Sequence, residues 1–94
     1  YVDVTPSMDY ALQQNYPNPF NPSTKIRFTI PEASIVNLTV FNAIGEQVKT
    51  LVNNYYDAGS HEVIFNASNL TSGIYFVRME SGSFVSTRKI TLLK

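Results

Sequence analysis

Apolar and polar residues alternate along most of the chain, which is the period of a half-buried β-strand. The first clear run places Ile26, Phe28 and Ile30 on one face, with polar residues between them. The same pattern predicts further strands over residues 36–41, 47–52, 61–65, 73–80 and 84–93. Turn-forming residues separate these runs, and residues 53–60 in particular are predicted to form a polar loop closed by Gly59.

These six or seven short segments recur about every ten residues, and no segment has the helical period. Parallel sheets need crossover helices, so the strands are expected to pair antiparallel. The predicted fold class is all-β: an immunoglobulin-like antiparallel β-sandwich of about seven short strands. The chain has no cysteine, so this sandwich lacks the disulfide of antibody domains.

The N-terminal part of the chain shows a different pattern. Residues 1–14 have no periodicity and are predicted to be a linker, in which residues 8–14 form at most a turn or so of helix. Residues 15–24 hold three of the five prolines, each of which fixes its own φ and extends the residue before it. We expect a stiff, extended leader that presents Tyr16 and Phe20 to one side. The folded domain is accordingly predicted to span residues 15–94.

Charge and composition exclude several classes of function. Seven basic residues balance seven acidic ones, and this formal net charge of zero argues against a general nucleic-acid or anionic-membrane binder. With no cysteine and a single histidine, thiolate zinc sites, cysteine nucleophiles and His-rich metal sites are excluded. No apolar run approaches the ~20 residues of a transmembrane helix. The chain begins at Tyr1 without a secretory signal, so we expect it to be a piece of a longer protein.

Three residue types of a catalytic triad occur close together, at Asp57, Ser60 and His61. A triad is defined by geometry and a held nucleophile, whereas these residues share one predicted turn, so we expect packing roles and no enzymatic activity. Asp57 with Asn53 and Asn54 offers oxygen ligands to calcium, but it is the only carboxylate of the three. We therefore expect turn chemistry here, with no metal and no cofactor.

Two adjacent tyrosines, Tyr55 and Tyr56, lie beside asparagines in the same predicted loop. Exposed aromatic rings of this kind can stack on sugars. A carbohydrate-binding or spacer module is therefore the alternative function that the residues themselves suggest.

Six short motifs follow one another in a fixed order along the chain. They comprise the proline-rich leader and residues 36–42, 45–48, 58–65, 70–76 and 87–94. Together, over residues 15–94, they resemble the type A C-terminal sorting domain of the type IX secretion system, also called the Por secretion system. The positions that the family motif suggests are structural are Pro17, Asn18, Pro19, Phe20, Gly45, Gly59, Gly73 and Tyr75. The fold also resembles the immunoglobulin-like module of flagellar hook-assembly proteins, which is a further alternative.

The resemblance implies a sorting signal at the C-terminus of cargo proteins of Bacteroidetes and related phyla. Such a domain directs its covalently linked upstream cargo from the periplasm through an outer-membrane translocon, to the cell surface or the extracellular space. A cell-surface transpeptidase commonly removes the domain, here in or near the linker before Asn15. The implied partners are thus the translocon, the transpeptidase and the cargo, with no nucleic acid and no transmembrane segment.

The last strand is the predicted recognition element, because a terminal edge strand offers unpaired backbone groups for β-augmentation. Arg88, Lys89 and Lys94 are expected to steer an acidic receptor surface, with Leu92 and Leu93 beside them. The alternative is that these charges only keep the edge strand from aggregating. The charge distribution is uneven: residues 1–62 carry three basic and six acidic residues, whereas residues 63–94 carry four and one.

Overall fold

A computed structural model of the chain describes residues 9–94, which form seven β-strands and no helix. The strands are β1 (Ala11–Leu12), β2 (Ser23–Ile30), β3 (Ser34–Asn42), β4 (Gln47–Tyr56), β5 (Gly59–Asn66), β6 (Gly73–Ser81) and β7 (Phe84–Leu92). All paired strands run antiparallel, as predicted from the lack of any helical segment.

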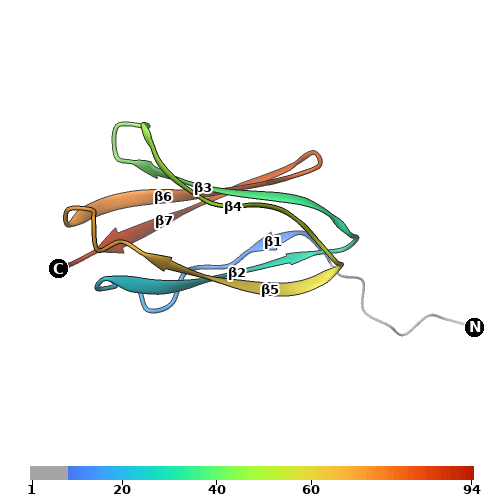
Figure 1. Cartoon of the computed structure of the whole chain (residues 1–94), viewed down its shortest axis with the longest axis horizontal. Coiled ribbons are helices and arrows are strands. Elements are labelled where there is room, and N and C mark those ends of the chain that lie inside the picture. Colours follow the sequence, from blue (N-terminus) through green and yellow to red (C-terminus); the bar gives the residue numbers. More distant parts are fainter. Residues whose placement is uncertain (1–8) are drawn as a thin grey trace, which may run out of the picture.

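The strands form two sheets that face each other (Figure 1). The smaller sheet has the order β1-β2-β5, and the larger sheet has the order β4-β3-β6-β7. The prediction of an all-β antiparallel sandwich is therefore confirmed.

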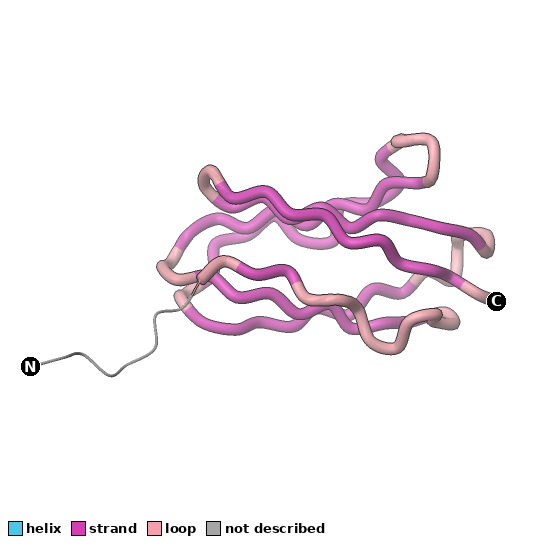
Figure 2. The backbone as a smooth tube through the Cα atoms, turned by 180° about the vertical axis from the view of Figure 1, so that it is seen from behind, coloured by secondary structure: helices cyan, strands magenta, loops and turns pink. Residues whose placement is uncertain are grey.

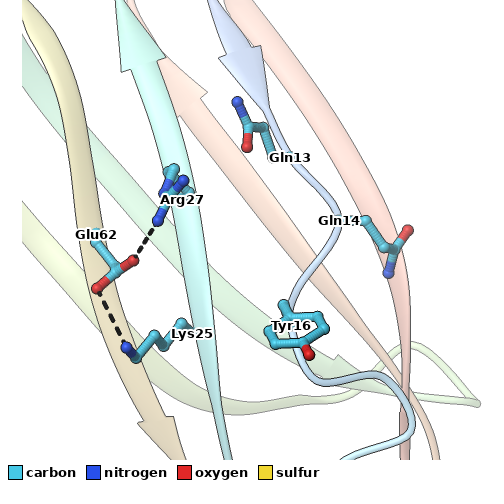
Figure 3. Close-up of a pocket in the computed structure, with 6 residues that line it drawn as sticks. All are labelled: Gln13, Gln14, Tyr16, Lys25, Arg27 and Glu62. Carbon is cyan, nitrogen blue, oxygen red and sulfur yellow. Dashed lines mark hydrogen bonds and ion pairs between the residues drawn. The ribbon is translucent and has the colours of Figure 1, made fainter.

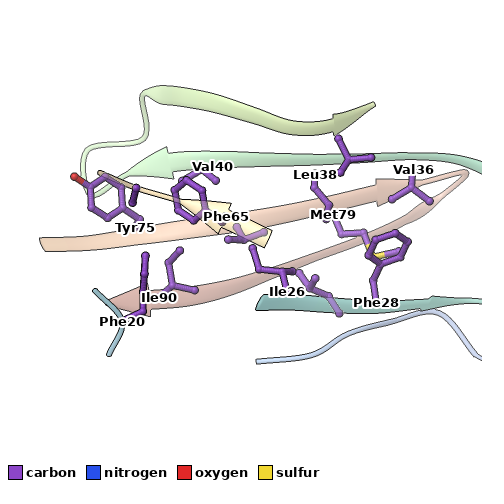
Figure 4. Packing of buried hydrophobic residues seen from close by; sticks show 14 of the residues in the cluster. Phe20, Ile26, Phe28, Val36, Leu38, Val40, Phe65, Tyr75, Met79 and Ile90 are labelled. Carbon is purple, nitrogen blue, oxygen red and sulfur yellow. The ribbon is translucent and has the colours of Figure 1, made fainter. Parts of the chain in front are cut away.

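The alternating residues of each strand supply the core between the sheets (Figure 4). From the smaller sheet, Ile26 and Phe28 point inward and are at most 1% exposed. From the larger sheet, Val36, Leu38 and Val40 are fully buried against them. A two-residue period in the sequence thus becomes one buried face on each sheet.

Two tight turns depend on glycine. Gly45 lies in the β3–β4 turn with φ 89°, and Gly82 lies in the β6–β7 hairpin with φ 58°. Side chains rarely adopt these left-handed conformations, so glycine is required for the chain to reverse there.

The predicted polar loop over residues 53–60 is wrong for most of its length. Asn53 to Tyr56 continue β4, Gly59 begins β5, and only residues 57–58 lie between the two strands. The cause is cross-strand pairing: Asn53 lies opposite Asn37, and Tyr55 lies opposite Ile35. Such tertiary pairing overrides the weak strand propensity of asparagine.

The sandwich also includes residues for which a linker was predicted. Ala11–Leu12 form a strand instead of a helical turn, and Leu12 is buried opposite Phe28 of β2. The ring of Tyr10 stacks on Phe84 of β7, with centroids 4.9 Å apart. Residues 1–8 of the predicted linker lie outside the described residues.

Tyr16 and Phe20 do not face the same side, which corrects the prediction for the leader. Tyr16 is 79% exposed, whereas Phe20 is only 2% exposed and packs against Phe65. The reason is that the leader changes partner between them: Tyr16 bridges to Lys25 of the smaller sheet, and Phe20 bridges to Leu92 of the larger sheet.

Candidate functional site: the C-terminal strand and its leader

The proline-rich leader covers one edge of β7, as it runs along the side of the sandwich toward the end where the C-terminus lies (Figure 2). The N–H of Phe20 donates to the carbonyl oxygen of Thr91 (2.9 Å), and the N–H of Leu93 donates to the carbonyl oxygen of Phe20 (2.9 Å). The side-chain oxygen of Asn18 accepts from the N–H of Thr91 (3.0 Å). The leader therefore holds the last residues of the chain through main-chain and side-chain bonds.

Two further bonds extend this attachment toward the middle of β7. The side-chain amide of Gln14 donates to the carbonyl oxygen of Lys89 (2.7 Å). The guanidinium Nε of Arg88 donates to the carbonyl oxygen of Leu12 (2.8 Å). The prediction that β7 is an open edge is thus wrong for its C-terminal half, because a preceding segment of the same chain occupies that edge.

The two predicted leucines lie in opposite environments. Leu92 is fully buried in the core, whereas its neighbour Leu93 is 61% exposed. Successive side chains of a strand point to opposite faces, so both cannot contact the same partner. Leu92 therefore stabilises the fold, and of these two leucines only Leu93 can be contacted by a receptor.

The three predicted basic residues are exposed near this end of β7. Among the described residues, Arg88, Lys89 and Lys94 make no salt bridge, whereas Lys25, Arg27 and Arg78 do. Lys94 is positioned by neutral groups: its ammonium donates to the carbonyl oxygen of Ser68 (2.7 Å), and its N–H donates to the hydroxyl of Ser72 (2.9 Å). None of these three positive charges is therefore compensated by a salt bridge within residues 9–94.

The leader contains a buried polar network that the alternation of apolar and polar residues does not predict. Asn15 and Thr24 are 4% and 2% exposed, and the Asn15 amide donates to the Thr24 hydroxyl (3.1 Å). Both side chains also donate to the carbonyl oxygen of Pro17. These bonds satisfy the buried polar groups, as burial requires, and they close the leader into a loop. The only signal in the sequence was that Asn15 and Thr24 are the first and last residues of the proline-rich motif.

The family-motif positions occupy several different places. Pro17 supplies the carbonyl oxygen of that network, Asn18 holds Thr91, and Pro19 is exposed between Asn18 and the buried Phe20. Tyr75 is buried, and its hydroxyl donates to the carbonyl oxygen of Thr71 (2.7 Å). Among the glycines, Gly45 forms the turn described above, while Gly59 and Gly73 begin β5 and β6.

The three triad-type residues do not form a relay. His61 Nε2 contacts the main-chain oxygen of Asp57 (2.7 Å) and not its carboxylate. The hydroxyl of Ser60 pairs instead with the hydroxyl of Thr29 on β2 (3.0 Å). The His61 ring packs against Tyr56, with centroids 4.7 Å apart, so it helps to close the β4–β5 hairpin.

The two adjacent tyrosines cannot form one stacking platform. Tyr55 is 65% exposed on the outer face of the larger sheet, whereas Tyr56 is half-buried and its ring meets Phe28 edge-on. They point to opposite faces because they are consecutive residues of β4. This geometry removes the feature on which the carbohydrate-binding alternative was based.

A small charged hollow lies on the outer face of the smaller sheet (Figure 3). Its volume is about 250 Å³, and it is lined by Gln13, Gln14, Tyr16, Lys25, Arg27 and Glu62. Glu62 bonds to Arg27 (2.9 Å) and lies 4.0 Å from Lys25. The hydrogen bond from Arg27, helped by the charges of both cations, lowers the pKa of the Glu62 carboxyl below its ordinary value.

Residues 9–94 lack two further kinds of feature, a metal-binding group and a membrane-spanning helix. This part of the chain contains no group of three or more histidine and acidic side chains placed to hold a metal ion. It likewise contains no helix with the length and apolar character needed to cross a bilayer.

The fold and the leader-bound strand define this chain as a small all-β sandwich module. The family model described as "Secretion system C-terminal sorting domain" matches residues 14–93, and the chain belongs to this family. Searches of curated proteins and of solved structures return no match.

Membership in this family establishes the general function. These domains are the C-terminal sorting signals of type IX secretion, which serves export to the cell surface or the extracellular space. A sorting domain also implies a type IX system and an upstream cargo. The carbohydrate-binding, spacer and flagellar alternatives are not favoured by this match.

Proposed function

We propose that the export machinery recognises the exposed side of the C-terminal segment through Lys89, Leu93 and Lys94. The observation that carries this proposal is that these residues are exposed, while the backbone beside them is already fixed by the leader. The role of Arg88 and Leu92 is to hold the segment in place, since Arg88 bonds to Leu12 and Leu92 is buried.

The charge of the segment supports an acidic surface on the receptor. Lys89 and Lys94 make no salt bridge within residues 9–94, so binding to carboxylates would not require an existing ion pair to break. Complementary charge of this kind mainly raises the association rate and the specificity. For this role the sorting domain needs only to be recognised, and it does not need any catalytic activity of its own.

We further propose the partners and the route. The domain passes through the periplasm with its cargo, binds the outer-membrane translocon, and is then removed by a cell-surface transpeptidase. Residues 10–14 pack into the sandwich, so the cleaved bond is expected to lie before Tyr10 and not immediately before Asn15. A peptidase needs accessible, extended backbone, which the packed residues do not offer.

The test is an export assay on a reporter with a secretory signal peptide, fused to residues 1–94 in a host with a type IX system. Changing Lys89→Gln and Lys94→Gln together should lower surface display about tenfold, equivalent to ~1.4 kcal/mol of binding. The matched control is Lys25→Gln with Lys49→Gln, which removes the same charge from other strands and should be exported normally. Urea unfolding of each variant shows whether the fold is retained.

Two outcomes would contradict recognition at Lys89 and Lys94. If the Lys89/Lys94 variant is exported like the unchanged fusion, these lysines are not recognised. If both double variants lose export equally, net charge matters and not this site. Wild-type fusion retained in the periplasm, alongside a sorting domain that is exported, would count against the route itself.

A further inference from the structure

The edges of the two sheets are protected to different degrees. The leader covers the C-terminal half of β7, and β1 is only two residues long. The β3–β4 ladder has two register shifts, which are bulges or irregularities of the kind that disturb an edge for pairing. By contrast β5 pairs with β2 in one unbroken register from Gly59 to Asn66, and among the described residues no strand lies on its other side.

The hydrogen-bond pattern shows which backbone groups of β5 face outward. Ala67 donates to Pro22, so the odd-numbered residues of this segment face β2. Partners alternate along an antiparallel ladder, and the even-numbered residues therefore direct their N–H and C=O groups away from the sheet. These outward-facing residues are Ser60, Glu62, Ile64 and Asn66.

This edge lacks the devices that usually block strand addition. β5 has no proline and no lysine, and its one carboxylate, Glu62, is turned toward Arg27 and Lys25 of β2 (Figure 3). Ile64 is 68% exposed. On the core side, Val63 is only partly buried, as are Val48 and Leu51 of β4. An added strand could therefore bury apolar surface as well as form main-chain bonds.

The opposite side of the sandwich shows what kind of segment fits such a position. There residues 11–20 are extended, bond first to β2 and then to β7, and insert Leu12 and Phe20 into the core. The β4–β5 side has no equivalent segment within residues 9–94.

We propose that the outer edge of β5 accepts an extended strand of a partner protein. In that strand, apolar residues on the core face of the sheet, next to Val63, alternate with uncharged polar residues on the outer face, next to Glu62. Apolar residues suit the partly buried core side, and neutral polar residues avoid placing a second carboxylate opposite Glu62. This interaction is separate from recognition at Lys89 and Lys94, because β5 and β7 belong to different sheets.

A second copy of the chain fits this edge less well. In an antiparallel pair of β5 strands, the residues with outward-facing backbone groups must stand opposite each other. Two registers satisfy this condition and align nearly all of β5 with its copy. One register sets Glu62 against Glu62, and the other sets Glu62 against Ile64. Both place the carboxylate opposite an unfavourable neighbour.

Amide hydrogen exchange followed by NMR tests the proposal on the whole chain. The probe is an eight-residue peptide in which valine alternates with threonine between two terminal lysines. Without peptide, the amides of Ser60, Glu62, Ile64 and Asn66 should exchange fast. Saturating peptide should slow them at least about tenfold, the effect expected of a newly formed hydrogen bond. The amides of His61, Val63 and Phe65 already bond to β2 and should change little.

Matched variants locate the binding edge. Ile64→Pro removes one outward N–H from β5 and should weaken peptide binding about tenfold. Thr87→Pro removes an outward N–H from the uncovered part of β7 and should leave binding unchanged. If Ile64→Pro unfolds the chain, a fully N-methylated peptide tests the same bonds with the protein intact, and it should not protect β5.

Three results would overturn the proposal. One is unchanged exchange of the β5 amides with peptide, and another is protection at Val85 and Thr87 instead. The third is fast-exchanging β5 amides becoming protected with rising protein concentration alone, together with a dimer mass in solution, since the occupant would then be a second copy. Each result leaves the export test of the lysines unaffected.

Discussion

Phe20 and Tyr16 are aromatic residues of the same leader with opposite environments, and this contrast gives a prediction about single residues. Phe20→Ala should lower the free energy of unfolding by about 3–5 kcal/mol, because it leaves a cavity between the sheets beside Phe65. Tyr16→Ala is the matched control and should change stability by less than about 0.5 kcal/mol, since its ring is in solvent. Urea unfolding measures both, and similar values for the two variants would contradict this arrangement.

The N-terminal segment gives a prediction about an element. A chain of residues 15–94 should be less stable than residues 9–94 by about 2–5 kcal/mol, the cost of losing a buried Leu12. It also loses the Tyr10–Phe84 stack, the bond that Arg88 donates to the carbonyl oxygen of Leu12, and the bond that Gln14 donates to the carbonyl oxygen of Lys89. Denaturant unfolding of the two chains makes the comparison. Equal stability would show that the folded unit begins at Asn15 after all.

The elements differ in how far the sequence could predict them. Strand β2 was predictable because Ile26, Phe28 and Ile30 alternate in a single half-buried strand. The short β1 was not, because two residues cannot show a period and their strand character comes from pairing with β2. The exposed lysines of the candidate site were likewise visible in the pattern. The coverage of β7 by the leader was not, since it joins Asn18 and Phe20 to Thr91 across most of the chain.

The leader connects the last residues of the chain to the smaller sheet. This connection affects the interpretation of truncations that are used to map export signals. Phe20 bonds to Thr91 of β7 and to Leu93 just after it, while four residues earlier Tyr16 exchanges two bonds with Lys25 of the smaller sheet. The C-terminal residues are therefore both the proposed recognition segment and an anchor of the leader. Loss of export after deleting them cannot by itself distinguish a lost signal from a damaged fold.

Comparing a deletion of residues 91–94 with a deletion of Lys94 alone should distinguish damage to the fold from loss of the recognition signal. The longer deletion removes the buried Leu92 and the partners of Phe20, so it should lower the free energy of unfolding by at least about 2–5 kcal/mol. It should also speed hydrogen exchange at the amide of Lys25, which lies in the smaller sheet and donates to the carbonyl oxygen of Tyr16. Deleting only Lys94 should leave both quantities nearly unchanged, because it breaks only exposed bonds to Ser68 and Ser72. If the longer deletion leaves Lys25 exchange unchanged, the leader is held independently of the C-terminal strand, and loss of export on truncation then reports recognition directly.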